Sequence, residues 1–342
     1  MNFNFLILFS LLSLSILMGT CSSSYMYIWM SIEINMMAFI PMILFFNKTF
    51  NNSMMKYFII QSISSSMILF FSLLIMSMNS SKFLMMLILA ISLKIGSAPF
   101  MKWYLNMLKN MSWFNCFILM TIQKTLPFYI LSSTIKNIYF LNDKTIMKFI
   151  YFIIILTSIM SLFFLKFSNS LKIFMGISSI NHLSWLMLTM IINQKFWLIY
   201  FLIYSNMLMN LIYLMNKFKL IYIHDLYIMI NMNNFMKMFF TSNLLIFMSL
   251  PPFIGFFLKT FSMMIFMSMK LYPIMYMLLL IFTFIFFYYL KLYLPSMLFF
   301  NTNNLSNLKI KLFMNTSMNM IVKLSMIMLI TPMTYWLITN IM

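Results

Sequence analysis

The sequence consists almost entirely of apolar runs of about 20 residues, the length of helix that crosses the hydrocarbon core of a bilayer. Hydrophobic residues make up 64% of the 342-residue chain, and charged residues make up only 7%. Soluble domains carry about 25% charged residues, so the composition excludes a water-soluble fold. Backbone groups in lipid must satisfy their own hydrogen bonds, which favours helices. We therefore predict an all-α polytopic membrane protein.

The breaks between apolar runs predict about eleven transmembrane helices. The runs lie near residues 3–22, 25–46, 56–78, 83–105, 113–135, 146–166, 171–192, 196–216, 237–269, 272–297 and 319–341. The run at 237–269 is too long for one straight span and contains Pro251, Pro252 and Gly255, so we predict a broken helix there. The longest polar connection, residues 217–236, is predicted to be an interfacial helix.

Every basic residue is a lysine, and the lysines lie in ones and twos between the apolar runs. This distribution argues against nucleic-acid binding and favours contact with anionic lipid. Connections after the even-numbered spans carry more lysines than the others. By the positive-inside rule, the N-terminus is then expected on the matrix or cytoplasmic side, and the C-terminus on the opposite side.

Residues that could hold a metal or redox group are few. Cys21 and Cys116 fall in different predicted spans, and His182 and His224 are far apart. No CxxC pair, GxGxxG motif or P-loop occurs in the sequence. We therefore expect no haem, metal, iron–sulfur cluster or nucleotide in this chain.

The composition also indicates where the chain is made. Abundant Met and Asn together with the absence of Arg are typical of a very AT-rich genome, such as that of an organelle. The amino terminus begins an apolar run at once and shows no presequence. Synthesis inside an organelle would account for both features.

The charged residues Glu33, Lys94, Lys124 and Lys259 lie inside stretches that are otherwise apolar enough to span a membrane. A charge at the centre of a spanning helix costs about 3 kcal/mol on insertion scales, so such residues are typical of functional sites. Burial favours a neutral lysine, whereas a nearby carboxylate favours the ammonium form. These four residues are therefore candidates for a proton or ion path.

Two of the lysines lie beside interruptions of the helical pattern. Lys94 belongs to the segment LKIGSAPF (93–100), and Lys259 belongs to LPPFIGFFLKT (250–260). A broken helix leaves backbone groups that can hold water or ions, and interruptions in both halves of a chain point to inverted repeats. We predict two five-helix repeats at 1–140 and 141–297, within a single membrane domain that continues with a loop and C-terminal helix at 298–342. Simple kinks with lysines that snorkel to the interface remain an alternative.

Seven fragments in order match the sequence pattern of one family. They are WMSIEINMMAFIPMI (29–43), KYFIIQSISSS (56–66), LKIGSAPF (93–100), SWFNCFILMTIQKTLP (112–127), LKIFMGISSINHLSWLML (171–188), FWLIYFLIYS (196–205) and LPPFIGFFLKT (250–260). In these fragments the chain closely resembles the subunit 2 family of mitochondrial NADH:ubiquinone oxidoreductase, respiratory complex I. The resemblance extends over roughly residues 25–295.

The resemblance implies an antiporter-like subunit of the proton-pumping membrane arm. Glu33 falls on the family's membrane glutamate and Lys94 on the lysine of the first broken helix, and these two would form a switchable ion pair. Lys124 matches the central lysine, and Lys259 matches the lysine of the second broken helix. His182 falls on a family histidine and is a candidate for the proton relay.

The resemblance further implies membership of an enzyme, the proton-translocating NADH:ubiquinone reductase. NADH, FMN, iron–sulfur clusters and ubiquinone would all act in other subunits. The expected partners are neighbouring antiporter-like and small subunits of the membrane arm, together with an anionic lipid such as cardiolipin. The expected location is the mitochondrial inner membrane, with the N-terminus in the matrix and the C-terminus in the intermembrane space.

The chain departs from the family pattern at two places. Residues 101–106 (MKWYLN) stand where the family usually has His-Phe-Trp-Phe-Pro-Glu, so we expect no relay through that segment. Leu258 replaces a proline before Lys259, and the bend there would depend on Pro251, Pro252 and Gly255.

Other interpretations stay open. The chain could be a free-standing cation/proton antiporter, or a scaffold subunit whose charges hold helices together. Glu33 could fix helix packing, and Lys124 could hydrogen-bond across a helix pair. His182 lies among Ser178, Ser179, Asn181 and Ser184, residue types that are typical of contacts between membrane helices.

Overall fold

A computed structural model describes residues 3–46, 52–78, 80–141, 143–226, 234–251 and 253–298. Within these residues the regular secondary structure is α-helical, apart from a short 3₁₀ turn at 223–226 and an isolated antiparallel bridge between Ser170 and Tyr222. The all-α prediction is confirmed for this part of the chain. The predicted C-terminal span at 319–341 lies outside the described residues, as does part of the predicted interfacial segment at 217–236.

Seven helical stretches among the described residues are long and apolar enough to cross a membrane. They are Tyr25–Phe45, Met54–Met78, Trp113–Tyr139, Lys144–Lys166, Leu171–Ile191, Lys195–Lys217 and Tyr272–Tyr293. Three shorter apolar helices cover Phe5–Cys21, Phe239–Met248 and Ile254–Met267. The chain is therefore a multi-pass membrane protein, and the finer count of eleven spans stays a prediction.

The chain forms two compact units, which we describe separately. The first unit comprises residues 1–164 and 172–194, and the second comprises residues 165–171 and 195–342. The division into repeats at 1–140 and 141–297 is a different partition of the chain and stays a prediction.

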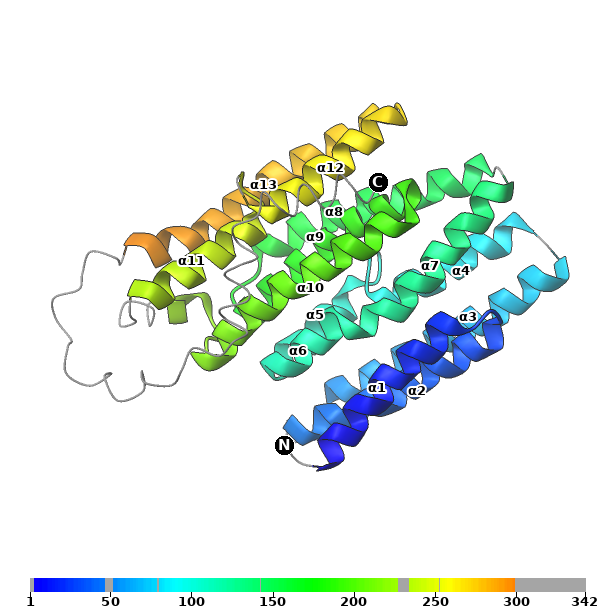
Figure 1. Ribbon diagram of the computed structural model, residues 1–342, viewed down its shortest axis with the longest axis horizontal. Helices are drawn as coiled ribbons and strands as arrows, with labels where there is room; N and C mark the ends of the chain where they lie inside the picture. The colour runs from blue at the N-terminus through cyan, green and yellow to red at the C-terminus, as the bar shows by residue number, and fades with distance from the viewer. Residues whose placement is uncertain are drawn as a thin grey trace. The chain divides into compact units, whose positions relative to one another are not determined.

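The first unit contains nine helices within its described residues. They are α1 (Phe3–Cys21), α2 (Tyr25–Phe46), α3 (Asn52–Met78), α4 (Ser81–Ile95), α5 (Met101–Asn110), α6 (Trp113–Met120), α7 (Ile122–Leu141), α8 (Lys144–Lys166) and α9 (Leu171–Ile192). Helices α1, α2 and α3 run alongside one another (Figure 1), and α3 packs on α4. Helix α9 is buried over 94% of its most apolar 18 residues, so its small polar side chains face protein rather than lipid.

The second unit contains four helices within its described residues. They are α10 (Gln194–Lys217), α11 (Asn234–Met248), α12 (Ile254–Ser268) and α13 (Tyr272–Leu298). Helices α11, α12 and α13 contact one another in pairs and lie side by side in Figure 1. One aromatic pair joins α11 and α13: the ring centroids of Phe247 and Tyr289 lie 6.1 Å apart.

The structure differs from the predicted spans at one position. The run at 113–135, predicted as one membrane span, is divided into α6 and α7 at Thr121, which has φ −120° and ψ −79°. The Thr121 hydroxyl donates a hydrogen bond of 2.7 Å to the Phe117 carbonyl. Lys124 N–H then bonds the Thr121 carbonyl at 2.9 Å, three residues back, which tightens the first turn of α7.

Candidate functional site

Helix α4 ends at the glycine of the first predicted interruption. Gly96 has φ +76° and ψ 32°, the left-handed conformation in which a glycine carries no Cβ penalty. Its N–H bonds the Leu93 carbonyl at 3.3 Å, and the Ser97 N–H bonds the Ser92 carbonyl at 3.0 Å. This pair of bonds is the Schellman motif, so the predicted break is a defined helix terminus.

Side chains from neighbouring helices donate hydrogen bonds to two carbonyls in the last turn of α4. Trp103 of α5 donates its indole N–H to the Leu93 carbonyl at 3.1 Å. Gln61 of α3 donates from Nε2 to the Lys94 carbonyl at 3.2 Å. Three helices therefore converge on the backbone of the interruption, and the last turn of α4 is fixed from two sides.

We expect Gly96→Ala to lower the free energy of unfolding by about 1–2 kcal/mol, the cost of a left-handed L-residue. A Cβ at this position would also lie 2.9 Å from the Tyr104 Cβ. The measurement is the temperature of thermal inactivation in isolated membranes. Gly96→Asn is the control, because Asn tolerates the left-handed region but carries the same Cβ. If Asn is destabilised as much as Ala, packing against Tyr104 accounts for the loss.

Lys94 lies in the last turn of α4, and its ammonium is enclosed by protein. Among the described residues, Lys94 Nζ has no hydrogen-bond partner. Glu33 of α2 is close enough to act electrostatically on Lys94, and the Glu33 carboxylate accepts a hydrogen bond from the Ser65 hydroxyl of α3. A direct Glu33–Lys94 ion pair stays a prediction, because Glu33 is bound to Ser65 in this structure.

Lys124 of α7 is 2% exposed and is held by three contacts. Its ammonium donates hydrogen bonds to the Tyr104 hydroxyl at 3.0 Å and to the Ser179 hydroxyl at 3.4 Å. It also lies 4.3 Å from the centroid of the Tyr104 ring, within the range of a cation–π interaction. Tyr104 comes from α5 and Ser179 from α9, so Lys124 joins three helices of the first unit.

One small polar cavity brings Lys94 and Lys124 together. Its volume is about 10 Å³, and a cavity needs about 10–15 Å³ to hold one water molecule. It is lined by Tyr57, Gln61, Lys94, Ile95, Trp103, Tyr104, Leu119, Gln123 and Lys124. The Gln123 amide nitrogen has no hydrogen-bond partner among the described residues, and the Gln123 side-chain oxygen accepts from Tyr57 at 3.3 Å. Unsatisfied donors around such a space favour a bound water.

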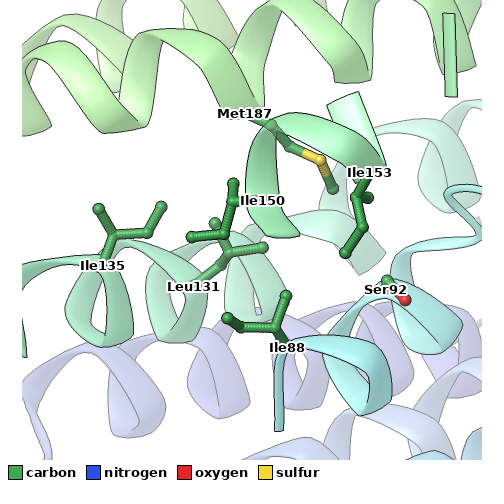
Figure 2. Close-up of a pocket in the computed structure, with 7 residues that line it drawn as sticks. All are labelled: Ile88, Ser92, Leu131, Ile135, Ile150, Ile153 and Met187. Atoms are coloured by element: carbon green, nitrogen blue, oxygen red, sulfur yellow. The ribbon is translucent and has the colours of Figure 1, made fainter. Parts of the chain in front are cut away.

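A second cavity of similar size in the same unit has a different chemistry. Figure 2 shows side chains of α4, α7, α8 and α9 around it, and they are Ile88, Ser92, Leu131, Ile135, Ile150, Ile153 and Met187. The lining is apolar apart from Ser92, whose hydroxyl donates to the Leu89 carbonyl of its own helix. Apolar cavities of this size stay dry, so this space offers no path for a proton.

His182 lies on α9 in the first unit and is 2% exposed. Ser178, Ser179 and Ser184 of the same helix are also buried, and each hydroxyl donates to a carbonyl three residues earlier. The structure therefore places His182 in the polar interior of the unit, and its part in proton transfer stays a prediction.

In the second unit, α11 ends in the same motif as α4, but with a serine in place of glycine. Ser249 has φ +58°, its N–H bonds the Ile246 carbonyl at 2.9 Å, and the Leu250 N–H bonds the Leu245 carbonyl at 3.4 Å. Gly255, in the first turn of α12, packs directly against the Ile246 carbonyl, where a Cβ would overlap that oxygen. The predicted break before Lys259 is thus present, and Pro252 lies outside the described residues.

Lys259 of α12 belongs to the second unit and is 3% exposed. Its ammonium lies 3.9 Å from the centroid of the Phe282 ring of α13, a cation–π contact. Desolvation makes such contacts worth about 2 kcal/mol or more. Lys259 is therefore buried in protein and does not snorkel.

Sequence reasoning missed several polar groups of the first unit. Tyr104 lies in the segment 101–106, which departs from the family pattern, and its hydroxyl is a direct partner of Lys124. Gln61 and Gln123 also line the cavity. Their only sequence signal is a polar side chain within an apolar helix, which many packing residues share. Among the described residues no group of three or more His, Cys, Asp or Glu could hold a metal ion.

The fold and the buried lysines define a class of protein. A multi-pass helical membrane protein with charged side chains enclosed at interrupted helices is typical of ion-translocating membrane proteins. Comparison with known sequences gives the particular family. The pattern of the family described as NADH:quinone oxidoreductase/Mrp antiporter, TM matches residues 22–287. The chain belongs to this family.

Individual relatives agree with the family match. The chain is 31% identical over 248 residues to NADH-ubiquinone oxidoreductase chain 2 of Anopheles gambiae, which covers 70% of both chains. It is 33% identical over 138 residues to the same subunit of Locusta migratoria, covering 37% of this chain and 40% of that one. In the first three curated relatives the aligned segment spans about two fifths of their length. The resemblance to the subunit 2 family is confirmed.

Solved structures support the same fold. A chain of respiratory complex I from Thermus thermophilus with bound aureothin matches with a TM-score of 0.77 and 15% identity, over 86% of this chain and 71% of that one. A chain of the Mrp complex from Dietzia sp. DQ12-45-1b matches with a TM-score of 0.71 and 10% identity, over 84% of this chain and 59% of that one. The chain therefore has the antiporter-like fold that these complexes share.

Proposed function

We propose that this chain is a proton-translocating subunit of the membrane arm of respiratory complex I. The observation that carries the proposal is the polar cavity that joins Lys94 to the buried, hydrogen-bonded Lys124. Two lysines around one water-sized space can exchange a proton without either ammonium entering lipid. NADH oxidation by ubiquinone would take place in partner subunits, and this chain would contribute as a component of that enzyme.

In the proposed mechanism Glu33 controls the charge of Lys94. A carboxylate near a buried lysine favours the ammonium form, and withdrawal of the carboxylate favours release of the proton. Glu33 is held by Ser65 in this structure, within electrostatic reach of Lys94. A change of partner at Glu33, from Ser65 to Lys94 and back, would thus load and unload the proton that passes to Lys124.

The proposal extends to the second unit by sequence pattern. Lys259 is buried beside an interrupted helix, as Lys94 is, and would carry the proton onward. Two five-helix repeats of opposite orientation would account for the two similar interruptions. His182, buried on α9, is a candidate intermediate carrier.

The family supports a set of partners and a location. The chain would lie in the mitochondrial inner membrane, with its N-terminus in the matrix and its C-terminus in the intermembrane space, among antiporter-like and small membrane-arm subunits. FMN, iron–sulfur clusters and the sites of NADH and ubiquinone would belong to other subunits. Exposed lysines near the helix ends would contact anionic lipid such as cardiolipin.

Co-migration on a native gel tests the assembly. We expect this chain, identified by mass spectrometry after mild solubilisation, in a large band that oxidises NADH. The reason is that an antiporter-like subunit without redox groups depends on partners for energy. Recovery in a small band without NADH activity would favour the free-standing antiporter, which ion-flux assays would then test.

A further inference from the structure

Lys124 is bound at one end of a short hydrogen-bonded chain that the proposed mechanism has not used. Its ammonium donates to the Tyr104 hydroxyl at 3.0 Å. The Tyr104 and Ser179 hydroxyl oxygens are 2.6 Å apart, and either can be the donor. Ser179 can in turn donate to the Gly176 carbonyl at 2.6 Å. The hydrogen-bonded chain runs from Lys124 through Tyr104 and Ser179 to Gly176. The side chains of Tyr104 and Ser179 are buried.

The protons of this hydrogen-bonded chain can be arranged in two ways, one for charged and one for neutral Lys124. A lysine ammonium has three donors and no acceptor, so Tyr104 must accept from charged Lys124. The Tyr104 proton then points to Ser179, and the Ser179 proton points to the Gly176 carbonyl. A neutral lysine has a lone pair, so Tyr104 can donate to it while Ser179 turns its proton to the Tyr104 oxygen. Both arrangements need only rotation of two hydroxyl groups, and no O–H bond breaks.

Each arrangement leaves Lys124 with a partner. A buried amine or ammonium without a hydrogen bond costs the full desolvation penalty of the group. A partner that could only accept would bind N–H groups of both forms, but it would leave the lone pair of the neutral amine without a donor. Tyr104 serves both, because its neighbour Ser179 can accept from it or donate to it.

We propose that Tyr104, oriented by Ser179, is the positioning residue that lets Lys124 gain and lose its proton while it stays buried. The inference rests on the proposed function of Lys124 as a proton carrier. Tyr104 also lines the cavity that Lys94 and Lys124 share. The reacting atoms stay those of the lysines, and Tyr104 acts through Lys124.

The test compares variants within the assembled complex in membrane vesicles, with proton uptake followed by a pH-sensitive dye during NADH oxidation. We expect Tyr104→Phe to slow proton uptake about tenfold, the loss expected from one hydrogen bond to a charged group. The pH profile of the rate should also be displaced, which a purely structural role would leave in place. Tyr139→Phe is the control, because Tyr139 lies on α7 with Lys124 and its hydroxyl donates to the Ile191 carbonyl of α9 at 2.6 Å.

Two variants of Ser179 test the orientation step and serve if Tyr104→Phe does not assemble. Ser179→Ala removes the hydroxyl that lets Tyr104 change from accepting to donating a hydrogen bond at Lys124. We expect proton uptake to be about threefold to tenfold slower. Ser179→Thr keeps the hydroxyl and should restore most of the rate. Equal rates for Ala and Thr, or a native rate and pH profile for Tyr104→Phe, would overturn the inference.

The same assay separates this inference from the proposed function. If Lys124→Met stops proton uptake while Tyr104→Phe does not change it, Lys124 carries protons without help from Tyr104 and Ser179. In that case only the inference fails. If Lys124→Met also pumps at the native rate, the proposed function fails as well.

Discussion

Replacing Lys124 with methionine is expected to reduce NADH-driven proton pumping at least a hundredfold, in a complex that still assembles. A positioned proton donor or acceptor contributes about 10²–10⁴-fold in rate, and methionine has none to offer. Methionine has a similar length and adapts to irregular space, so it fits the site. Tyr104 loses one hydrogen-bond partner but keeps Ser179. The measurement is proton uptake by membrane vesicles at saturating NADH and ubiquinone.

The control is Lys109→Met, which removes an exposed lysine at the end of α5 in the same unit. We expect it to pump at the native rate. A scaffold role predicts the opposite pattern for Lys124→Met, with lost assembly and no defect in any complex that remains. A sodium requirement for pumping in the native chain would favour a cation/proton antiporter.

Gly255→Ala is expected to destabilise the second unit by about 3 kcal/mol, near the upper end for overpacking. The added Cβ would overlap the Ile246 carbonyl, a backbone group fixed by the end of α11. Relief would require α12 to move away from α11, and Lys259 would move with it. The measurement is the amount of the chain in assembled complex and the temperature of its thermal inactivation.

Gly19→Ala is the comparison, because its Cβ would meet the side chains of Leu126 and Ser31, which can change rotamer. Alanine also favours a helix over glycine by about 1 kcal/mol, which offsets part of the crowding. We therefore expect a loss of about 1 kcal/mol or less. Equal losses for Gly255→Ala and Gly19→Ala would contradict the assigned role of the Ile246 carbonyl.

Some parts of the site were predictable because a charged residue stands out in an apolar run. A lysine in an apolar run, as at Lys124 or Lys259, must be enclosed by protein or by water, and both are enclosed. The interruption after Lys94 was predictable because Gly96 and Pro99 do not continue a helix. In these places the signals for a span, a buried charge and a helix end all lie within a few residues of one another.

Other parts have no distinctive residue type in the sequence. The interruption at Thr121 has neither Gly nor Pro, and it depends on a hydroxyl that bonds back to Phe117. Threonine does this in many continuous helices, so the residue type alone does not predict a break. Ser249 takes the left-handed conformation that usually belongs to glycine, so its residue type did not predict the end of α11. Tyr104 becomes part of the site only because α5, α7 and α9 meet.

The hydrogen bond from Gln61 to the Lys94 carbonyl separates motion of the Lys94 backbone from motion of the Lys94 side chain. It fixes the backbone of the residue, while the ammonium at the other end of four rotatable bonds has no bond of its own among the described residues. Rotation of a side chain requires no movement of a helix, and helix movement takes microseconds to milliseconds. The charge of Lys94 can thus change its position by rotation of the side chain alone, while the backbone of Lys94 stays in place.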